Sequence, residues 1–201
     1  MPDIRPSILS IQVGKAAPLE ASGVMSGFVK RVVRGPVVIA PLGLTGDEQA
    51  DLSVHGGPDK AVYFYPSEHY ATWAREFPEH HGLFAPGGFG ENLTTAGLIE
   101  NTVAIGDIFS VGNALLQVTQ PRQPCFKLAI RFNDRRLGRA MLRCPRRYRW
   151  CGRRRRYGDP SGPPQCSLDH PALRRSDRAW QNEHRRVGRA HGAAWPPDDM
   201  A

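Results

Sequence analysis

The sequence lacks any apolar run that approaches the roughly 18 residues needed to cross a membrane. Its first residues also lack the basic-then-apolar order of a secretory signal peptide. Only four cysteines occur among 201 residues, and their spacing matches no common zinc motif. Because disulfides form in exported proteins, we expect a cytoplasmic protein without a disulfide framework and without a membrane partner.

Lysine, isoleucine and phenylalanine are absent from residue 142 onward, where fourteen arginines occur. Residues 1–140 carry 13 basic and 13 acidic side chains, so the net charge of +8 comes entirely from the remaining 14 basic and 6 acidic residues. The apolar residues of this segment follow neither a strand period nor a helix period. We therefore expect residues 142–201 to be a disordered Arg/Pro-rich tail, following a folded domain of residues 1–141.

Three origins of this tail remain open. It could be a natural basic arm that binds nucleic acid or acidic lipid, with Tyr148 and Trp150 available for stacking. It could also be an ordinary solvated terminus. The interpretation that we favour is out-of-frame translation of a GC-rich gene, which adds Arg, Pro, Gly, Ala and Trp and removes Lys, Ile and Phe.

The first segment has the pattern of a mainly β fold with a few helices. Runs of β-branched and aromatic residues predict strands at 37–40, 61–65, 103–109 and 114–118, the last two joined by a turn at Gly112 and Asn113. One helix is predicted after Ser67, its N-cap, with apolar residues at helical spacing up to Phe77. Many short strands with few helices favour a β-barrel or a similar architecture.

Two loops that precede strands combine glycines with polar side chains. Residues 42–49 contain Asp47, which could orient a neighbouring base or amide, although a plain surface turn explains this segment as well. In residues 55–60, the pair Gly56 and Gly57 could direct backbone N–H groups at a phosphate, with Lys60 adding charge and His55 a switchable donor. A structural Gly-Gly turn is the alternative.

Two further segments carry candidate site residues. The glycine-dense segment 87–93 includes Glu91 and Asn92 and could bring backbone close to a ligand, or serve only as a connection. Cys125 follows two prolines and lies between Arg122 and Lys127. Rigid backbone would fix the thiol in place, and the adjacent positive charge favours the thiolate, the form that binds soft metals. A lone cysteine can equally be a small buried apolar residue.

The order of these motifs resembles that of MOSC domains, and within them of the bacterial YiiM-type group. The resemblance extends over about residues 8–141. It rests on the following segments, together with Trp73 and the Gly106-Asp107 pair: LTGDEQ (44–49), HGGPDKA (55–61), YPSEHY (65–70), FGENL (89–93) and QPRQPCFKL (120–128). The tail is unlike the family, which continues beyond the cysteine with further strands and a helical region. A domain ending at residue 141 would therefore lack the strands and helices that complete the barrel.

The resemblance implies a MOSC-type β-barrel that binds the molybdenum cofactor (molybdopterin), with Cys125 as the metal ligand and catalytic residue. The expected activity is the reduction of N-hydroxylated compounds, including hydroxylamino base analogues such as 6-hydroxylaminopurine, for detoxification. Electrons would come from a partner reductase, because the sequence shows no flavin, haem or iron–sulfur motif. Pyridoxal phosphate is not expected. The cofactor-binding candidates are Asp47, His55, Gly56, Gly57, Lys60, Glu91, Asn92 and Arg122.

Two other functions remain open. The domain could carry the cofactor, or transfer sulfur as a persulfide on Cys125, without any reductase activity. The basic tail could instead bind nucleic acid, which predicts steeply salt-dependent binding that is lost without residues 142–201. We favour the reductase, since blocks of like charge are usually only solvated.

Overall fold

The computed structural model describes residues 6–143 and 149–155. Its strands are β1 (Ser7–Val13), β2 (Ala17–Leu19), β3 (Val24–Ser26), β4 (Arg31–Val32), β5 (Ile39–Ala40), β6 (Gly43–Leu44), β7 (Val62–Pro66), β8 (Leu93–Ala96), β9 (Ile108–Val111), β10 (Ala114–Arg122) and β11 (Arg149–Arg155). The α-helices are α1 (Leu52–His55), α2 (Tyr70–Glu76), α3 (Phe126–Phe132) and α4 (Arg135–Arg143). Single 3-10 segments lie at Glu20–Ser22, Pro58–Lys60, Ser67–His69 and Pro78–Leu83.

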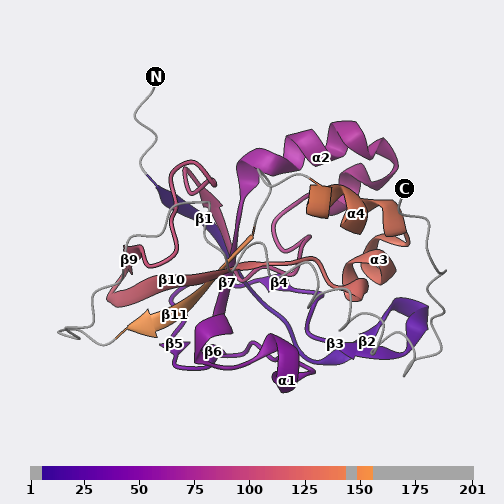
Figure 1. Cartoon of the computed structure of the whole chain (residues 1–201). Helices are drawn as coiled ribbons and strands as arrows, with labels where there is room; N and C mark the ends of the chain where they lie inside the picture. The colour runs from indigo at the N-terminus through magenta and orange to yellow at the C-terminus, as the bar shows by residue number, and fades with distance from the viewer. Residues whose placement is uncertain (1–5, 144–148, 156–201) are drawn as a thin grey trace. The chain divides into compact units, whose positions relative to one another are not determined.

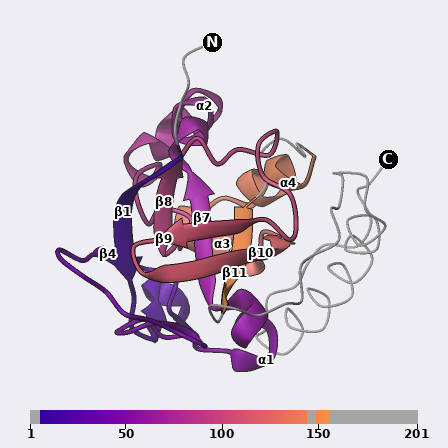
Figure 2. The same ribbon diagram turned by 90° about the vertical axis from the view of Figure 1, so that its left-hand side faces the viewer.

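A seven-stranded sheet in the order β4-β1-β8-β7-β11-β10-β9 forms the frame (Figure 1). Its neighbours are antiparallel except β7 and β8, which run parallel. The sheet curls into a half-barrel (Figure 2), and the pairs β2–β3 and β5–β6 form two small separate hairpins. The predicted mainly β fold with a few helices is confirmed. Among the described residues the sheet is open, because its edge strands β4 and β9 do not pair with each other.

Strand β7 is buried on both faces, which explains its continuous apolar sequence. Val62 and Phe64 enter one apolar cluster with residues of β8 and β10. Tyr63 and Tyr65 point to the opposite face, into an aromatic cluster that also contains residues of α2, α3 and α4. These three helices therefore cover one side of the sheet (Figure 1).

The predicted strands and helix differ from the observed ones mainly at their ends. Residues 62–65 of the predicted run 61–65 and the whole run 114–118 are confirmed as strand, and β10 pairs with β9 across the predicted turn at Gly112 and Asn113. Only Ile39–Ala40 of the run 37–40 is a strand, and β9 begins at Ile108 rather than at residue 103. The prediction that Ser67 caps the helix is wrong, because a 3-10 turn occupies Ser67–His69 and α2 begins after it.

Part of the segment predicted as a tail belongs to the sheet. Helix α4 ends at Arg143, and β11 lies between β7 and β10, pairing with both. Residues 144–148 and 156–201 lie outside the described residues, so disorder there and a frameshifted origin stay predictions. The domain boundary at residue 141 also stays a prediction.

Candidate functional site

One pocket gathers most of the predicted site residues. It contains about 510 Å³ of empty space, part of which is open to solvent. Six of the nine predicted residues line it, and the other three, Gly56, Gly57 and Glu91, do not. The six come from loops, from α1, from the 3-10 segment Pro58–Lys60, from the end of β10 and from the connection between β10 and α3: Asp47, His55, Lys60, Asn92, Arg122 and Cys125.

Cys125 lies between the end of β10 and the start of α3. Its backbone is extended, and its carbonyl oxygen accepts a hydrogen bond from the Leu128 N–H at 2.9 Å, as expected of a residue that begins a helix. The thiol is half-buried and is not part of a disulfide. The strand and the helix therefore fix the position of a thiol that lines the pocket.

Arg122 connects three parts of the pocket wall. Its Nη2 donates a hydrogen bond to His55 Nδ1 at 3.3 Å, and its guanidinium carbon lies 4.9 Å from the centroid of the Tyr63 ring. Burial, followed by the charges of Arg122, Lys127 and Lys60, lowers the pKa of His55 to about 3. His55 is therefore a neutral acceptor near pH 7. The prediction that His55 is a switchable donor is wrong, because this imidazole does not change charge in the physiological range.

Lys60 and Lys127 place two further ammonium groups at the pocket. Lys60 Nζ donates to the backbone carbonyl of Val54 at 2.6 Å, which anchors its side chain against α1. Lys127 is 8% exposed and has no hydrogen-bond or ion-pair partner within residues 6–143 and 149–155. The carboxylate of Asp51 interacts with this charge electrostatically, but not through an ion-pair contact. A largely buried ammonium without a direct acceptor predicts an anionic ligand, because desolvating such a group is costly.

The charges that line the pocket do not cancel. With His55 neutral, the basic side chains among the described lining residues are Lys30, Lys60, Arg122 and Lys127, and the acidic ones are Asp47 and Glu48. The pocket therefore carries an excess of two positive charges, which favours anions that enter from solvent.

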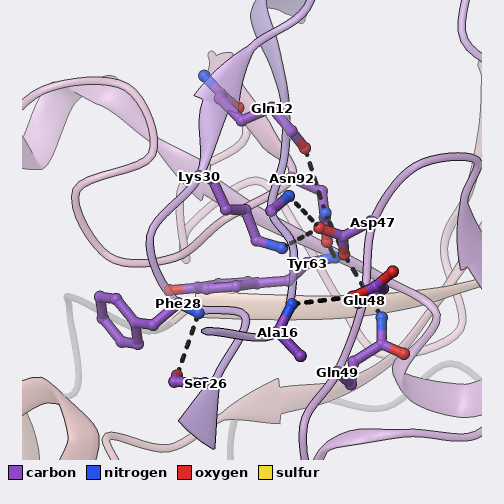
Figure 3. A network of polar contacts seen from close by, with 11 residues as sticks. Gln12, Ala16, Ser26, Phe28, Lys30, Asp47, Glu48, Gln49, Tyr63 and Asn92 are labelled. Atoms are coloured by element: carbon purple, nitrogen blue, oxygen red, sulfur yellow. Dashed lines mark hydrogen bonds and ion pairs between the residues drawn. The ribbon is translucent and has the colours of Figure 1, made fainter. Parts of the chain in front are cut away.

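The carboxylate of Asp47 lines the pocket and joins several segments of its wall by hydrogen bonds. Its carboxylate accepts hydrogen bonds from the Gly14 N–H at 2.7 Å, from Asn92 Nδ2 at 2.8 Å and from the Lys30 ammonium (Figure 3). Asn92 in turn accepts from the Tyr63 N–H through its Oδ1 at 3.1 Å. These two residues therefore connect the loop after β1, the loop before β4 and strand β7.

Glu91 supports the pocket from behind. It is fully buried, and its carboxylate accepts hydrogen bonds from the Gly87 N–H at 2.8 Å and the Phe89 N–H at 3.0 Å. The Tyr70 hydroxyl also donates to it. Burial raises the pKa of Glu91, and these hydrogen bonds oppose that rise. Its structural position fits a residue that fixes the glycine-rich loop 87–90, two residues of which, Phe89 and Gly90, line the pocket.

The Gly56-Gly57 pair shapes the turn that carries Lys60. Gly57 has φ +91°, which favours glycine, and its carbonyl accepts the Lys60 N–H at 3.1 Å. At Gly56 a Cβ atom would lie 2.8 Å from Leu52 Cδ2. The conformation and packing of the turn therefore explain both glycines. That their backbone N–H groups bind a phosphate stays a prediction.

Comparison with known proteins identifies the family. The family model of the MOSC domain matches residues 51–160, more than half of the chain. The chain belongs to the MOSC domain family. Its sequence is 55% identical to Protein YiiM of Escherichia coli (strain K12) over 111 residues, which cover 55% of this chain and 50% of that protein. It is also 48% identical to Uncharacterized protein YflK of Bacillus subtilis (strain 168) over 130 residues, 64% of this chain and 58% of that one.

A more distant relative and two solved structures are also similar to this chain. A protein named Reductase from Gibberella moniliformis (strain M3125 / FGSC 7600) is 39% identical over 127 residues, covering 62% of this chain but only 22% of that protein. The crystal structure of YiiM from Escherichia coli matches with a TM-score of 0.57 at 37% identity, over 80% of this chain and 64% of that one. YiiM from Geobacillus stearothermophilus matches with 0.62 at 28% identity, over 94% and 100%. The chain spans about half the length of the curated bacterial relatives it matches.

MOSC domains are associated in general with binding of the molybdenum cofactor, and the pocket of this MOSC domain fits such a group. The cofactor carries a phosphate and a dithiolene, so its site needs cations and a soft metal ligand. The pocket offers the Cys125 thiol, the excess positive charge and the unpartnered ammonium of Lys127.

Within the described residues, no helix of this domain is long and apolar enough to span a membrane.

Several pocket residues of this MOSC domain were not predicted from the sequence. Lys30, Phe28 and Ser26 come from the loop around β3 and β4, where no local motif marks them. Tyr63 was recognised only as part of a strand, although its alternation with Phe64 places it on the pocket face. Only the fold brings these residues to Cys125. The available signal was Lys30 itself, a lysine that follows the apolar residues Phe28 and Val29 and precedes Arg31.

Proposed function

We propose that this MOSC domain is a molybdenum-cofactor-dependent oxidoreductase that acts in the cytoplasm and reduces N-hydroxylated compounds, including hydroxylamino base analogues such as 6-hydroxylaminopurine. The observation that carries the proposal is the position of the Cys125 thiol in a pocket with an excess of positive charge. The reductase name of the fungal relative supports a redox role.

The chain's own side chains divide the work of holding the cofactor. Cys125 is the proposed metal ligand, and Lys60, Arg122 and Lys127 neutralise the phosphate and the dithiolene. When bound, the cofactor supplies two-electron redox chemistry at its metal. Asp47, Asn92 and Glu91 fix other loops of the pocket wall, so that this part of the pocket is preorganised.

The overall reaction takes two electrons and two protons: R–NH–OH + 2 e⁻ + 2 H⁺ gives R–NH₂ and H₂O. The N–O bond breaks, nitrogen is reduced, and the oxygen leaves as water. Electrons come from an electron-donating reductase. Phe28, a partly exposed aromatic residue, lines the pocket and provides a surface for a planar base.

A reduction assay on the full chain, loaded with cofactor in a host that makes it, tests this function. With a reduced viologen dye as electron donor, 6-hydroxylaminopurine should yield adenine, whereas 6-methylaminopurine, which has no N–O bond, should remain unchanged. The Cys125→Ser variant should lose at least about 100-fold in rate, since even changes to outer partners of metal ligands cost 10–100-fold. Cys166→Ser, outside the described residues, serves as the thiol control.

The alternative of a cofactor carrier predicts a different outcome. A carrier would hold molybdenum through Cys125 but would reduce none of a panel of hydroxylamines, amidoximes and hydroxamic acids. Rapid transfer of the cofactor or of sulfur from the loaded chain to an acceptor protein would favour this second function.

A further inference from the structure

Lys30 is a buried amine in the pocket wall. It lies in the loop between β3 and β4, and its side chain is 6% exposed. Its ammonium donates a hydrogen bond to Asp47, whose side chain is only 1% exposed (Figure 3). Lys30 also lines the pocket that contains Cys125. A charged pair is thus buried at the edge of a space where a ligand can enter.

The ammonium of Lys30 has donor capacity that the described residues do not use. A lysine ammonium carries three N–H bonds. Within residues 6–143 and 149–155 the only hydrogen-bond partner of Lys30 Nζ is Asp47. Buried polar hydrogens are normally paired, so N–H groups left over at a pocket wall point to a ligand that accepts them.

Asp47 holds this amine in one place. The carboxylate is itself fixed by the Gly14 N–H, by Asn92 Nδ2 and, at 3.4 Å, by Gln49 Nε2. A lysine that pairs with so constrained a carboxylate has lost most of the freedom of its flexible stem. The nitrogen is therefore positioned as a reacting group must be.

The surroundings also favour release of a proton from Lys30. Burial lowers the pKa of this amine below the ordinary 10.5. Asp47 raises the pKa, Arg122 lowers it and Glu91 raises it by a smaller amount, and the net direction is downward. An amine whose pKa lies closer to the working pH is a more effective general acid.

We propose that Lys30 is the proton donor of the N–O bond cleavage, with Asp47 as its positioning residue. The proposal rests on the reductase function above. As two electrons from the reductase reach the nitrogen, the N–O bond breaks and Lys30 Nζ transfers one proton to the departing hydroxyl oxygen, which leaves as water. The nitrogen takes the second proton from solvent in the open pocket. Solvent then returns a proton to the neutral Lys30 amine, and the balance of the overall reaction is kept.

A purely structural Lys30–Asp47 pair makes a different prediction. The Lys30→Arg variant keeps the positive charge and a hydrogen bond to Asp47, but a guanidinium does not give up a proton in a protein. If Lys30 only neutralises Asp47, this variant should reduce substrate as the wild type does. If Lys30 donates a proton, the variant should bind cofactor normally and fail in catalysis.

The test compares cofactor-loaded wild type with Lys30→Arg, Lys30→Ala and the control Lys15→Arg, whose lysine is exposed. We expect Lys30→Arg to lower kcat for 6-hydroxylaminopurine by about 10²–10⁴-fold, the usual contribution of a general acid. Molybdenum content and KM should change little. Small primary amines added to Lys30→Ala should restore part of the rate, and the restored rate should vary with the pKa of the amine. Lys15→Arg should match the wild type.

The outcomes separate this proposal from the one it rests on. An active wild type with an equally active Lys30→Arg variant, or no rescue by any amine, overturns the proton-donor role and leaves the reductase function standing. A loaded wild type that reduces no N-hydroxylated compound overturns both. If the single variants fail to fold, Lys30→Gln combined with Asp47→Asn removes both charges, and activity of that double variant within 10-fold of wild type also overturns the role.

Discussion

Asp47 and Glu48 are neighbours in the sequence, but their ion pairs lie in contrasting regions of the molecule. The Asp47–Lys30 pair belongs to the inner wall of the pocket, where the side chains are 1% and 6% exposed. The Glu48–Lys15 pair lies at the outer surface, where Glu48 also borders the pocket, and the two side chains are 46% and 69% exposed. The first pair holds three loops and faces the site, whereas the second is screened by water. Two pairs of a lysine with a carboxylate therefore differ in role because one is buried and the other is exposed.

The largest loss of stability is expected when the buried Asp47–Lys30 pair at the inner wall of the pocket is broken. Replacing Asp47 by alanine leaves the buried ammonium of Lys30 without a counter-charge and removes the acceptor of Gly14 and Asn92. Breaking such a buried pair costs about 3–5 kcal/mol. Urea denaturation should show this loss. A decrease below about 1 kcal/mol would mean that the pair is not buried in solution.

The next effect concerns the positive charge of the pocket. Lys127→Gln removes the unpartnered buried cation while keeping a side chain of similar length. If this lysine neutralises the cofactor, its loss should weaken cofactor retention by about 10–100-fold, corresponding to a charged hydrogen bond of about 1.5–3 kcal/mol. Dialysis followed by molybdenum analysis measures this. Lys15→Gln, at the outer surface, is the matched control and should retain the cofactor as the wild type does.

A smaller, pH-dependent effect is expected from His55. Its pKa is lowered to about 3 in the folded chain, against 6.5 for an ordinary histidine. The unfolded chain therefore binds a proton first as pH falls below 6.5, and stability decreases between pH 6.5 and 3 by up to about 1.4 kcal/mol per pH unit.

Urea melts of the cofactor-free chain at pH 6.5 and 5.5 measure this slope. His55→Gln, which keeps an acceptor for Arg122, should show a shallower slope than the wild type. The control His81→Gln, at an exposed histidine, should leave the slope unchanged. Equal slopes for all three proteins would show that His55 is not buried in a neutral form.

The smallest effect is expected at the outer surface. Glu48→Gln removes the ion pair with Lys15 and weakens the hydrogen bond from the Ala16 N–H. Since the pair is exposed, the denaturation midpoint should shift little, and any shift should vanish at high salt. A large shift that persists at high salt would remove the distinction between the two regions.

The sequence could predict the segments of the site but not their assembly. Asp47, His55, Lys60 and Cys125 lie within short motifs, so local patterns were sufficient to find them. Lys30 comes from a loop with no motif, and only tertiary folding places it against Asp47. Glu91 was predicted to bind the cofactor because it lies in a motif that resembles the family, whereas its carboxylate accepts hydrogen bonds from the Gly87 and Phe89 N–H groups.

The fold shows the same division. Strand β7 was found because burial on both faces leaves a continuous apolar run. Residues 103–107 were predicted as strand because Val103 and Ile105 are β-branched, but Asp107 accepts the Ala104 N–H through its side chain and turns the chain there. Strand β11 has no apolar period at all, and its place is set by the edges of β7 and β10 that it pairs with.

The central claim is that Cys125 anchors a molybdenum cofactor in this pocket, and elemental analysis of the purified, cofactor-loaded chain tests it most directly. We predict about one molybdenum per wild-type chain, as expected for a single thiolate site, and a nearly complete loss in Cys125→Ser at unchanged fold by circular dichroism. Molybdenum bound to Cys125→Ser at the wild-type level would contradict the assignment of the ligand.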